Sequence, residues 1–176
     1  DVQWSEEGIS SSHKFIQKLW SLNQKIMVEI SKDHKKNSSE KLKKFTNVFL
    51  KKMTDNLNSF SYNVLIANLH EMYTFLNKEI NNEYSKDELI NNYNKILITL
   101  IPIVPHFAFE CLEKNQFDFN QNWPVYNKDM LIEDSVKIVV QINGKKRGLV
   151  KTEIDISENE LLNFINNDEK ILKYVD

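Results

Sequence analysis

The sequence predicts a mostly α-helical protein: an antiparallel four-helix bundle followed by a small α+β unit that contains a β-hairpin and a short helix. Two observations predict it. Up to about residue 114, apolar residues recur at three- and four-residue steps, which is typical of amphipathic helices. From residue 136, they alternate with other residues, which is typical of a strand. The 41% hydrophobic fraction is sufficient for a packed core.

Four helices account for the first part of the chain. The apolar stripes of the predicted helices run over residues 10–30, 42–57, 65–76 and 89–100. Ser85 and Glu88 form a predicted capping box at the start of the fourth helix. Pro102 and Pro105 are expected to kink or divide this helix, because proline lacks the backbone N–H that a helix requires.

A β-hairpin is predicted in the last third of the chain. The first strand begins at Val136, and Asn143-Gly144 favours a tight type I′ turn, because both residues tolerate positive φ angles. A second strand is predicted over 147–156. A capping box at 157–160 then begins a short helix. The hinge is placed at 133–135, so the predicted domains are residues 1–134 and 135–176.

The composition excludes several classes of protein. A net charge of -2 gives no overall attraction to nucleic acid, so any basic function must be local. Cys111 is the only cysteine, which excludes an intramolecular disulfide and a thiolate zinc site. The sequence has neither a long apolar run nor a signal-like start, so we expect no membrane partner. The 22 lysines and 22 asparagines point to an AT-rich genome, so a lysine-rich stretch is first of all a solvated surface.

Candidate site residues are confined to basic segments. The hairpin carries five cations and no acid between residues 136 and 152, and such a projection suits phosphate groups. The candidate RNA-binding residues there are Lys145, Lys146, Arg147, Lys137 and Lys151. Arg147 is the only arginine, and its guanidinium can bind a phosphate through two hydrogen bonds. Weaker candidates in the second helix are Lys43, Lys44 and Lys51. The sequence contains no arrangement typical of a catalytic site, a metal site or a phosphate-binding glycine loop.

Five motifs, in order, resemble the C-terminal region of bacterial-type leucyl-tRNA synthetases, which are class I enzymes. They are Trp-Ser-Glu-Glu-Gly-Ile at 4–9, Tyr-Asn-Val-Leu-Ile-Ala at 62–67, Pro-x-x-Pro-His at 102–106, Trp-Pro at 123–124 and Val-Gln-Ile-Asn-Gly-Lys-Lys-Arg-Gly at 140–148. The last two are the most specific, and Lys146 stands in place of an apolar residue in the motif at 140–148. The resemblance covers nearly the whole chain.

The resemblance implies a role for each part. Residues 1–134 would be the helical anticodon-binding domain, with 1–9 as the junction to a catalytic core, and 135–176 an incomplete C-terminal domain. The parent enzyme would ligate leucine to tRNA(Leu) with ATP and Mg²⁺ in the cytoplasm. This segment would bind tRNA(Leu) and adjoin the catalytic and editing domains. It would hold no cofactor, do no chemistry and bind no DNA.

Two other interpretations of the sequence remain open. A helical protein–protein interaction module without nucleic-acid function would use the hairpin for protein contact. A free-standing enzyme is disfavoured by the lack of any catalytic constellation.

Overall fold

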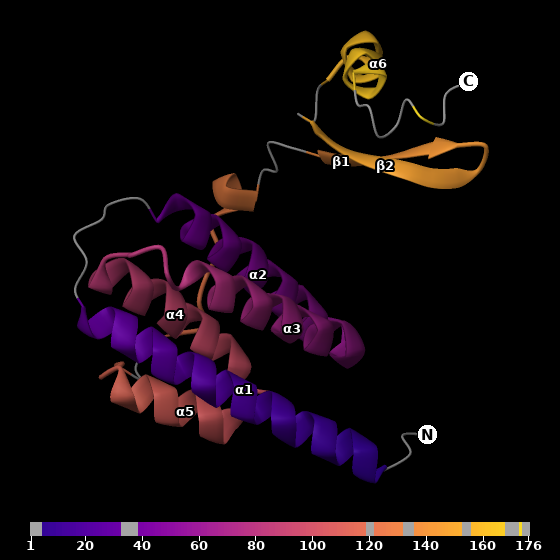
Figure 1. The fold of residues 1–176 in the computed structure, drawn as a ribbon. Helices are drawn as coiled ribbons and strands as arrows, with labels where there is room; N and C mark the ends of the chain where they lie inside the picture. The colour runs from indigo at the N-terminus through magenta and orange to yellow at the C-terminus, as the bar shows by residue number, and fades with distance from the viewer. Residues whose placement is uncertain are drawn as a thin grey trace. The chain divides into compact units, whose positions relative to one another are not determined.

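The computed structural model describes residues 5–32, 39–118, 122–131, 136–152, 156–167 and 173. The chain divides into two compact units, Asp1–Leu131 and Ile132–Asp176. The first is helical, and the second contains a hairpin and a short helix (Figure 1). The predicted hinge at 133–135, and with it the predicted domain boundary, lies outside the described residues.

The helical unit confirms the mostly α fold. Its elements are α1 (Glu6–Ser31), α2 (Glu40–Asn58), α3 (Tyr62–Glu79), α4 (Lys86–Leu100), α5 (Pro105–Lys114) and the short 3-10 helix η1 (Lys128–Leu131). The fourth predicted helix is divided into α4 and α5. Pro102 lies in the turn between them, and Pro105 takes the first position of α5, where no intrahelical N–H donor is needed.

The start of α1 differs from the prediction. The apolar stripe predicts a start near Ser10, but the helix begins at Glu6. Ser5 is the N-cap, and its hydroxyl oxygen accepts a hydrogen bond from the Gly8 amide at 3.1 Å. The polar first turn contains no apolar residue that faces the core, so periodicity alone could not locate it.

The predicted capping box at the start of α4 is wrong. The Ser85 side chain makes no capping hydrogen bond. Glu88 instead accepts a hydrogen bond from the Ser39 hydroxyl at 2.6 Å and forms an ion pair with Lys43 at 2.9 Å. These two partners, distant in sequence, replace the local one and join the start of α4 to the start of α2.

A continuous apolar core lies between the helices. Ile26 of α1, Met53 of α2, Leu65 of α3 and Leu97 of α4 are each fully buried. Aromatic side chains pack around this core, for example Phe45 and Phe75 with their ring centroids 3.7 Å apart. The predicted apolar stripes are therefore the surfaces by which the helices pack.

One carboxylate is buried at the end of α3. Glu79 is 2% exposed and accepts hydrogen bonds from Asn82 at 2.6 Å, from Tyr84 at 3.1 Å and from Lys41. Burial raises the pKa of Glu79, but the hydrogen bonds from Lys41, Tyr84 and Asn82 outweigh it, so the net pKa lies below the ordinary value. The cluster links α2 to the connection between α3 and α4.

The second unit contains the predicted hairpin. Strand β1 (Val136–Ile142) pairs antiparallel with β2 (Lys145–Thr152). Asn143 and Gly144 have φ angles of 54° and 73°, as a type I′ turn requires. The second strand starts two residues before the predicted Arg147, because a two-residue turn places Lys145 directly opposite Ile142.

Helix α6 (Glu158–Asn166) completes the second unit and packs against β2. The predicted capping box at its start is confirmed: the Ser157 hydroxyl accepts from the Glu160 amide, and the Glu160 carboxylate accepts from the Ser157 amide. Val140 and Thr152 are the buried side chains that the structure describes in this unit.

Candidate nucleic-acid interface

Arg147 lies at a β-bulge in the hairpin. Val140 is opposite Gly148 and Gln141 is opposite Lys146, so the register passes over Arg147. A bulge places two residues of one strand against one residue of the other and increases the local twist. The bulge therefore places the side chains of the consecutive residues Lys146 and Arg147 on the same side of the hairpin, beside the turn. The sequence alone did not predict this feature.

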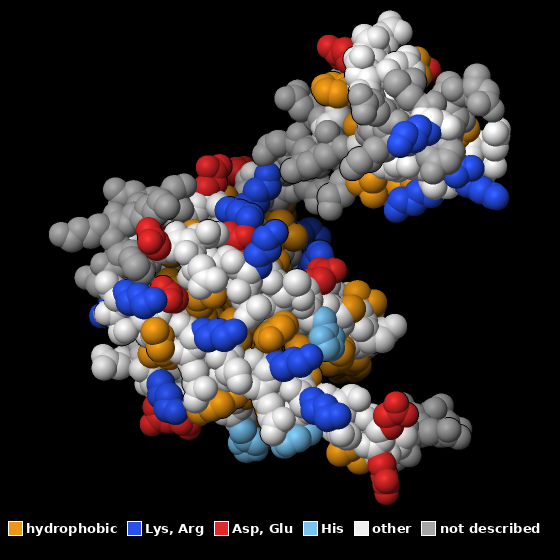
Figure 2. All heavy atoms as spheres, viewed as in Figure 1, with side chains coloured by type: hydrophobic (Ala, Val, Ile, Leu, Met, Phe, Trp, Pro, Cys, Tyr) orange, Lys and Arg blue, Asp and Glu red, His pale blue; other side chains and the backbone are white. Residues whose placement is uncertain are grey.

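Both cations belong to one face of the hairpin. Side chains alternate along a strand, so Arg147 lies on the same face as Leu149. Lys146 lies on the face of its partner Gln141, and this is also the face of Val139, two residues before Gln141. Val139 is paired with Leu149 on the same face, and these two are 46% and 48% exposed. In Figure 2, blue and orange side chains lie next to one another along the lower edge of this unit. The bulged face is thus basic and partly apolar.

Exposure differs among the basic side chains that the structure describes in the hairpin. Lys145 and Lys146 are exposed. Arg147 is half-buried and interacts within the chain, but a guanidinium carries five N–H donors, so it can bind more than one partner. Lys137 and Lys151 are opposite each other in the register, and their side chains lie outside the described residues.

The lysines predicted on α2 are engaged in other ways. Lys43 pairs with Glu88 at 2.9 Å, and Lys51 pairs with Asp55. Lys44 is half-buried and interacts within the chain. These contacts reduce the positive charge that the three lysines of α2 can offer to a phosphate group. The weaker ranking of the three lysines stays a prediction.

A second basic surface lies on α1, outside the segments that were predicted from the sequence as candidates. Lys14, Lys18 and Lys25 of α1 and Lys32, the C-cap of this helix, are all exposed and follow one another at steps of four, seven and seven residues. At 3.6 residues per turn, these steps keep the four side chains on one face of the helix. The signal was present in the spacing, but the lysine bias of the composition concealed it.

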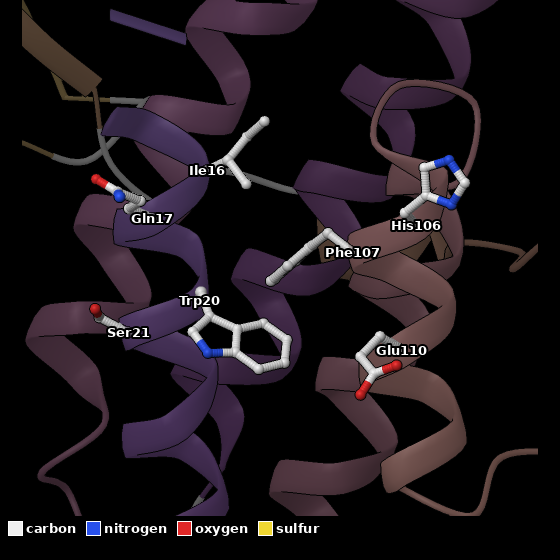
Figure 3. Close-up of a pocket in the computed structure, with 7 residues that line it drawn as sticks. All are labelled: Ile16, Gln17, Trp20, Ser21, His106, Phe107 and Glu110. Carbon is white, nitrogen blue, oxygen red and sulfur yellow. The ribbon is translucent and has the colours of Figure 1, made fainter. Parts of the chain in front are cut away.

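A hollow of about 740 Å³ lies between α1 and α5 (Figure 3). Ile16 and Trp20 of α1 and Phe107 of α5 line it, and His106 lies on its outer side. The Trp20 ring is packed edge-on against Phe107 at 6.3 Å and lies beneath the Lys114 ammonium at 4.6 Å. The hollow is therefore an aromatic seam between two helices, with His106 exposed at its rim.

Reactive groups are scarce in the described part of the chain. Burial raises the pKa of the Cys111 thiol to about 12, so the thiol is protonated near neutral pH. No group of three histidine, cysteine or acidic side chains among these residues could hold a metal ion. No described helix combines the length and apolar character needed to cross a membrane.

Comparison with known proteins identifies the class. The model of the family described as the anticodon-binding domain of tRNA ligase matches residues 39–165. This match includes parts of both units and well over half of the chain. The chain therefore belongs to this family of anticodon-binding domains.

The relatives narrow the class further. The chain is 32% identical over 188 residues to the leucine--tRNA ligase of Thermosipho melanesiensis, and 30% identical over 190 residues to that of Thermotoga maritima. Each alignment covers 100% of this chain and 23% of the relative. The chain thus spans about a quarter of the length of the curated relatives that it matches. These matches agree with the resemblance found in the sequence.

A solved structure has the same fold. It is a crystal structure of the ternary complex of Agrobacterium radiobacter K84 agnB2 LeuRS, tRNA and LeuAMS. The superposition has a TM-score of 0.71 at 16% sequence identity, and covers 99% of this chain and 24% of that chain.

Proposed function

We propose that this chain is the C-terminal, tRNA-binding portion of a leucine--tRNA ligase, and that it positions tRNA(Leu) without performing chemistry itself. The observation that carries the proposal is the family match over residues 39–165, which joins the helical unit to a basic hairpin. Similarity of the whole chain to about a quarter of each leucine--tRNA ligase supports the same parent.

In this proposal the hairpin supplies the contact to RNA. Lys145 and Lys146 bind phosphates as point charges, and Arg147 offers a planar array of donors that fits two phosphate oxygens. The Asn143-Gly144 turn and the bulge place these cations beside the end of the hairpin. Lys137 and Lys151 extend the basic segment along the two strands.

The parent enzyme would supply what this segment lacks. Its catalytic and editing domains, on the same polypeptide, would use ATP and Mg²⁺ to activate leucine, in the cytoplasm. The Cys111 thiol is buried and protonated and so is a poor nucleophile, which supports a binding role for this segment.

The test is the affinity of the chain for a tRNA(Leu) transcript, measured by filter binding in low salt. Replacing Lys145, Lys146 and Arg147 by alanine is expected to weaken binding and to make its salt dependence shallower by about one unit of slope per lost phosphate contact. The control variant replaces three exposed helical lysines outside the proposed contacts, Lys52, Lys86 and Lys114, of which Lys52 and Lys114 are paired with carboxylates. Equal affinities for the hairpin variant and the unchanged chain would contradict the hairpin contact.

One observation favours a second candidate function. The exposed apolar pair Val139 and Leu149 on the bulged face would also suit a protein partner. A protein interface of this kind depends weakly on salt, whereas displacement of phosphate counterions makes affinity fall steeply with the logarithm of the salt concentration. The salt series therefore discriminates between the two.

A further inference from the structure

The lysine row of α1, defined as Lys14, Lys18, Lys25 and Lys32, extends along most of the helix. Its ends are 18 residues apart, which corresponds to about 27 Å at 1.5 Å per residue. In Figure 2 a row of blue side chains follows the course that α1 takes in Figure 1. The row is long enough to follow a nucleic-acid strand rather than to bind a single anion.

Little negative charge offsets this row. From Gly8 to Val28 the sequence has no acidic residue. Lys25 donates to the neutral amide oxygen of Asn77 on α3, at 3.0 Å. Among the described residues, only Lys32 in the row forms an ion pair, with Glu29 at 2.6 Å.

The lysines of α2 show that the row is not simply a result of composition. Lys41, Lys43, Lys51 and Lys52 each form an ion pair with a carboxylate. The same abundance of lysine thus gives a surface neutralised by ion pairs on α2, whereas Lys14, Lys18 and Lys25 of α1 form no ion pair with the residues that the structure describes. Like charges four residues apart, as at Lys14 and Lys18, slightly destabilise a helix, so folding gives no reason for this arrangement.

Polar side chains accompany the row. Ser21, Gln24 and Lys25 of α1 line a shallow hollow of about 650 Å³ together with Asn77 of α3 and Asn81, which follows α3. Its one carboxylate, Glu29, forms the ion pair with Lys32. Amide and hydroxyl groups beside lysines suit the sugar and phosphate groups of RNA, including the 2′-hydroxyl. The row itself has no exposed aromatic side chain on which an unstacked base could lie, because Phe15 is half-buried and packs on His70 at 4.0 Å.

We propose that the lysine row of α1 and the adjoining α1–α3 hollow bind the sugar–phosphate backbone of a double-helical RNA stem. The inference rests on the proposed function and assigns it a second surface, on a helix outside the residues that the family model matches. Recognition here is of backbone shape and charge, because the surface offers cations and amides along a line and no platform for bases.

The experiment compares four forms of the 176-residue chain for binding to a tRNA(Leu) transcript over a salt series. They are the unchanged chain, the row variant Lys14→Ala/Lys18→Ala/Lys25→Ala, the hairpin variant and the control variant at Lys52, Lys86 and Lys114. The row and control variants remove equal charge from exposed helical sites, where alanine favours the helix. Far-UV circular dichroism verifies that each is folded.

The row variant is expected to bind about tenfold more weakly or worse near 0.1 M salt, with a slope shallower by about three. The control variant should keep the slope of the unchanged chain. If the unchanged chain binds and the row variant behaves like the control, the row proposal is overturned while the proposed function stands. If the unchanged chain does not bind the transcript at all, both are overturned.

Competition defines the type of RNA. A 16-base-pair RNA duplex should displace the transcript from the hairpin variant, which retains the row, more effectively than a single strand of equal length. Equal competition by the single strand would contradict the assignment to a double-helical stem.

Discussion

The helical unit contains 24 of the buried apolar residues that the structure describes, whereas the hairpin unit contains one, Val140. The helical unit also buries polar groups that satisfy one another, such as Tyr93 and Asn23, joined by a hydrogen bond of 3.0 Å. The hairpin instead keeps Val139 and Leu149 half-exposed beside its cations. The first unit is therefore organised around its own core, whereas the described part of the second unit leaves apolar side chains half-exposed beside its cations.

The largest expected effect is a difference in stability between the two units when the same leucine-to-alanine substitution is made in each. Leu97 is fully buried in α4, and Leu97→Ala should lower the free energy of unfolding by about 2–5 kcal/mol, because it leaves a cavity. Leu149 is 48% exposed in β2, and Leu149→Ala should cost less than about 1 kcal/mol. Urea denaturation measures both. Similar losses at the two positions would show that the hairpin has a core comparable to that of the bundle.

The buried carboxylate gives the next largest effect. Glu79→Gln should destabilise the chain by about 1–3 kcal/mol, since it weakens the bonds from Lys41, Asn82 and Tyr84 in a buried place. The pKa of Glu79 is lowered on folding, so its contribution is present above the unfolded value of about 4.3 and is lost as the pH falls through the folded pKa. Urea unfolding at several acidic pH values should show this loss in the unchanged chain and a smaller one in the variant. Identical pH profiles would contradict the assigned ionisation.

A smaller effect should be confined to the hairpin turn. Gly144 has a φ of 73°, and a Cβ added there would meet no atom within 4 Å. Gly144→Ala should therefore cost only the backbone strain, about 1 kcal/mol. Amide hydrogen exchange should accelerate in β1 and β2 and stay unchanged in the helical core. Accelerated exchange in α4 would mean that the two units unfold together.

The smallest effect is an absence of reaction. Burial raises the pKa of Cys111 to about 12, so the folded chain should resist iodoacetamide at pH 8 and react only after denaturation. Mass spectrometry of the alkylated protein measures this difference. Rapid alkylation of the folded chain would show that α5 opens away from the core.

Periodicity predicted most of the fold, because the core of a bundle is determined by which face of each helix is apolar. It could not predict the start of α1, where a polar turn is held by Ser5. The capping box expected at Ser85 failed for a different reason, since Glu88 binds Ser39 and Lys43 from a distant segment. A local sequence pattern cannot show that residues distant in the chain will replace a local hydrogen-bond partner.

The candidate site was predictable only in outline. The Asn-Gly turn and its cations could be predicted from the sequence, but the bulge at Arg147 follows from strand register, which depends on both strands at once. The contrast between the lysines of α1 and α2 was hidden for a similar reason. It depends on carboxylates such as Glu71 and Glu88, which belong to other helices.

The central claim is that this chain binds RNA through phosphate contacts made by both units. The most direct measurement is the affinity of the unchanged 176-residue chain for a tRNA(Leu) transcript as a function of salt. Contacts by Lys14, Lys18, Lys25, Lys145, Lys146 and Arg147 would give a slope of about -5 in the plot of log affinity against log salt, at roughly 0.9 for each phosphate. A slope near zero, or no binding in low salt, would contradict the claim.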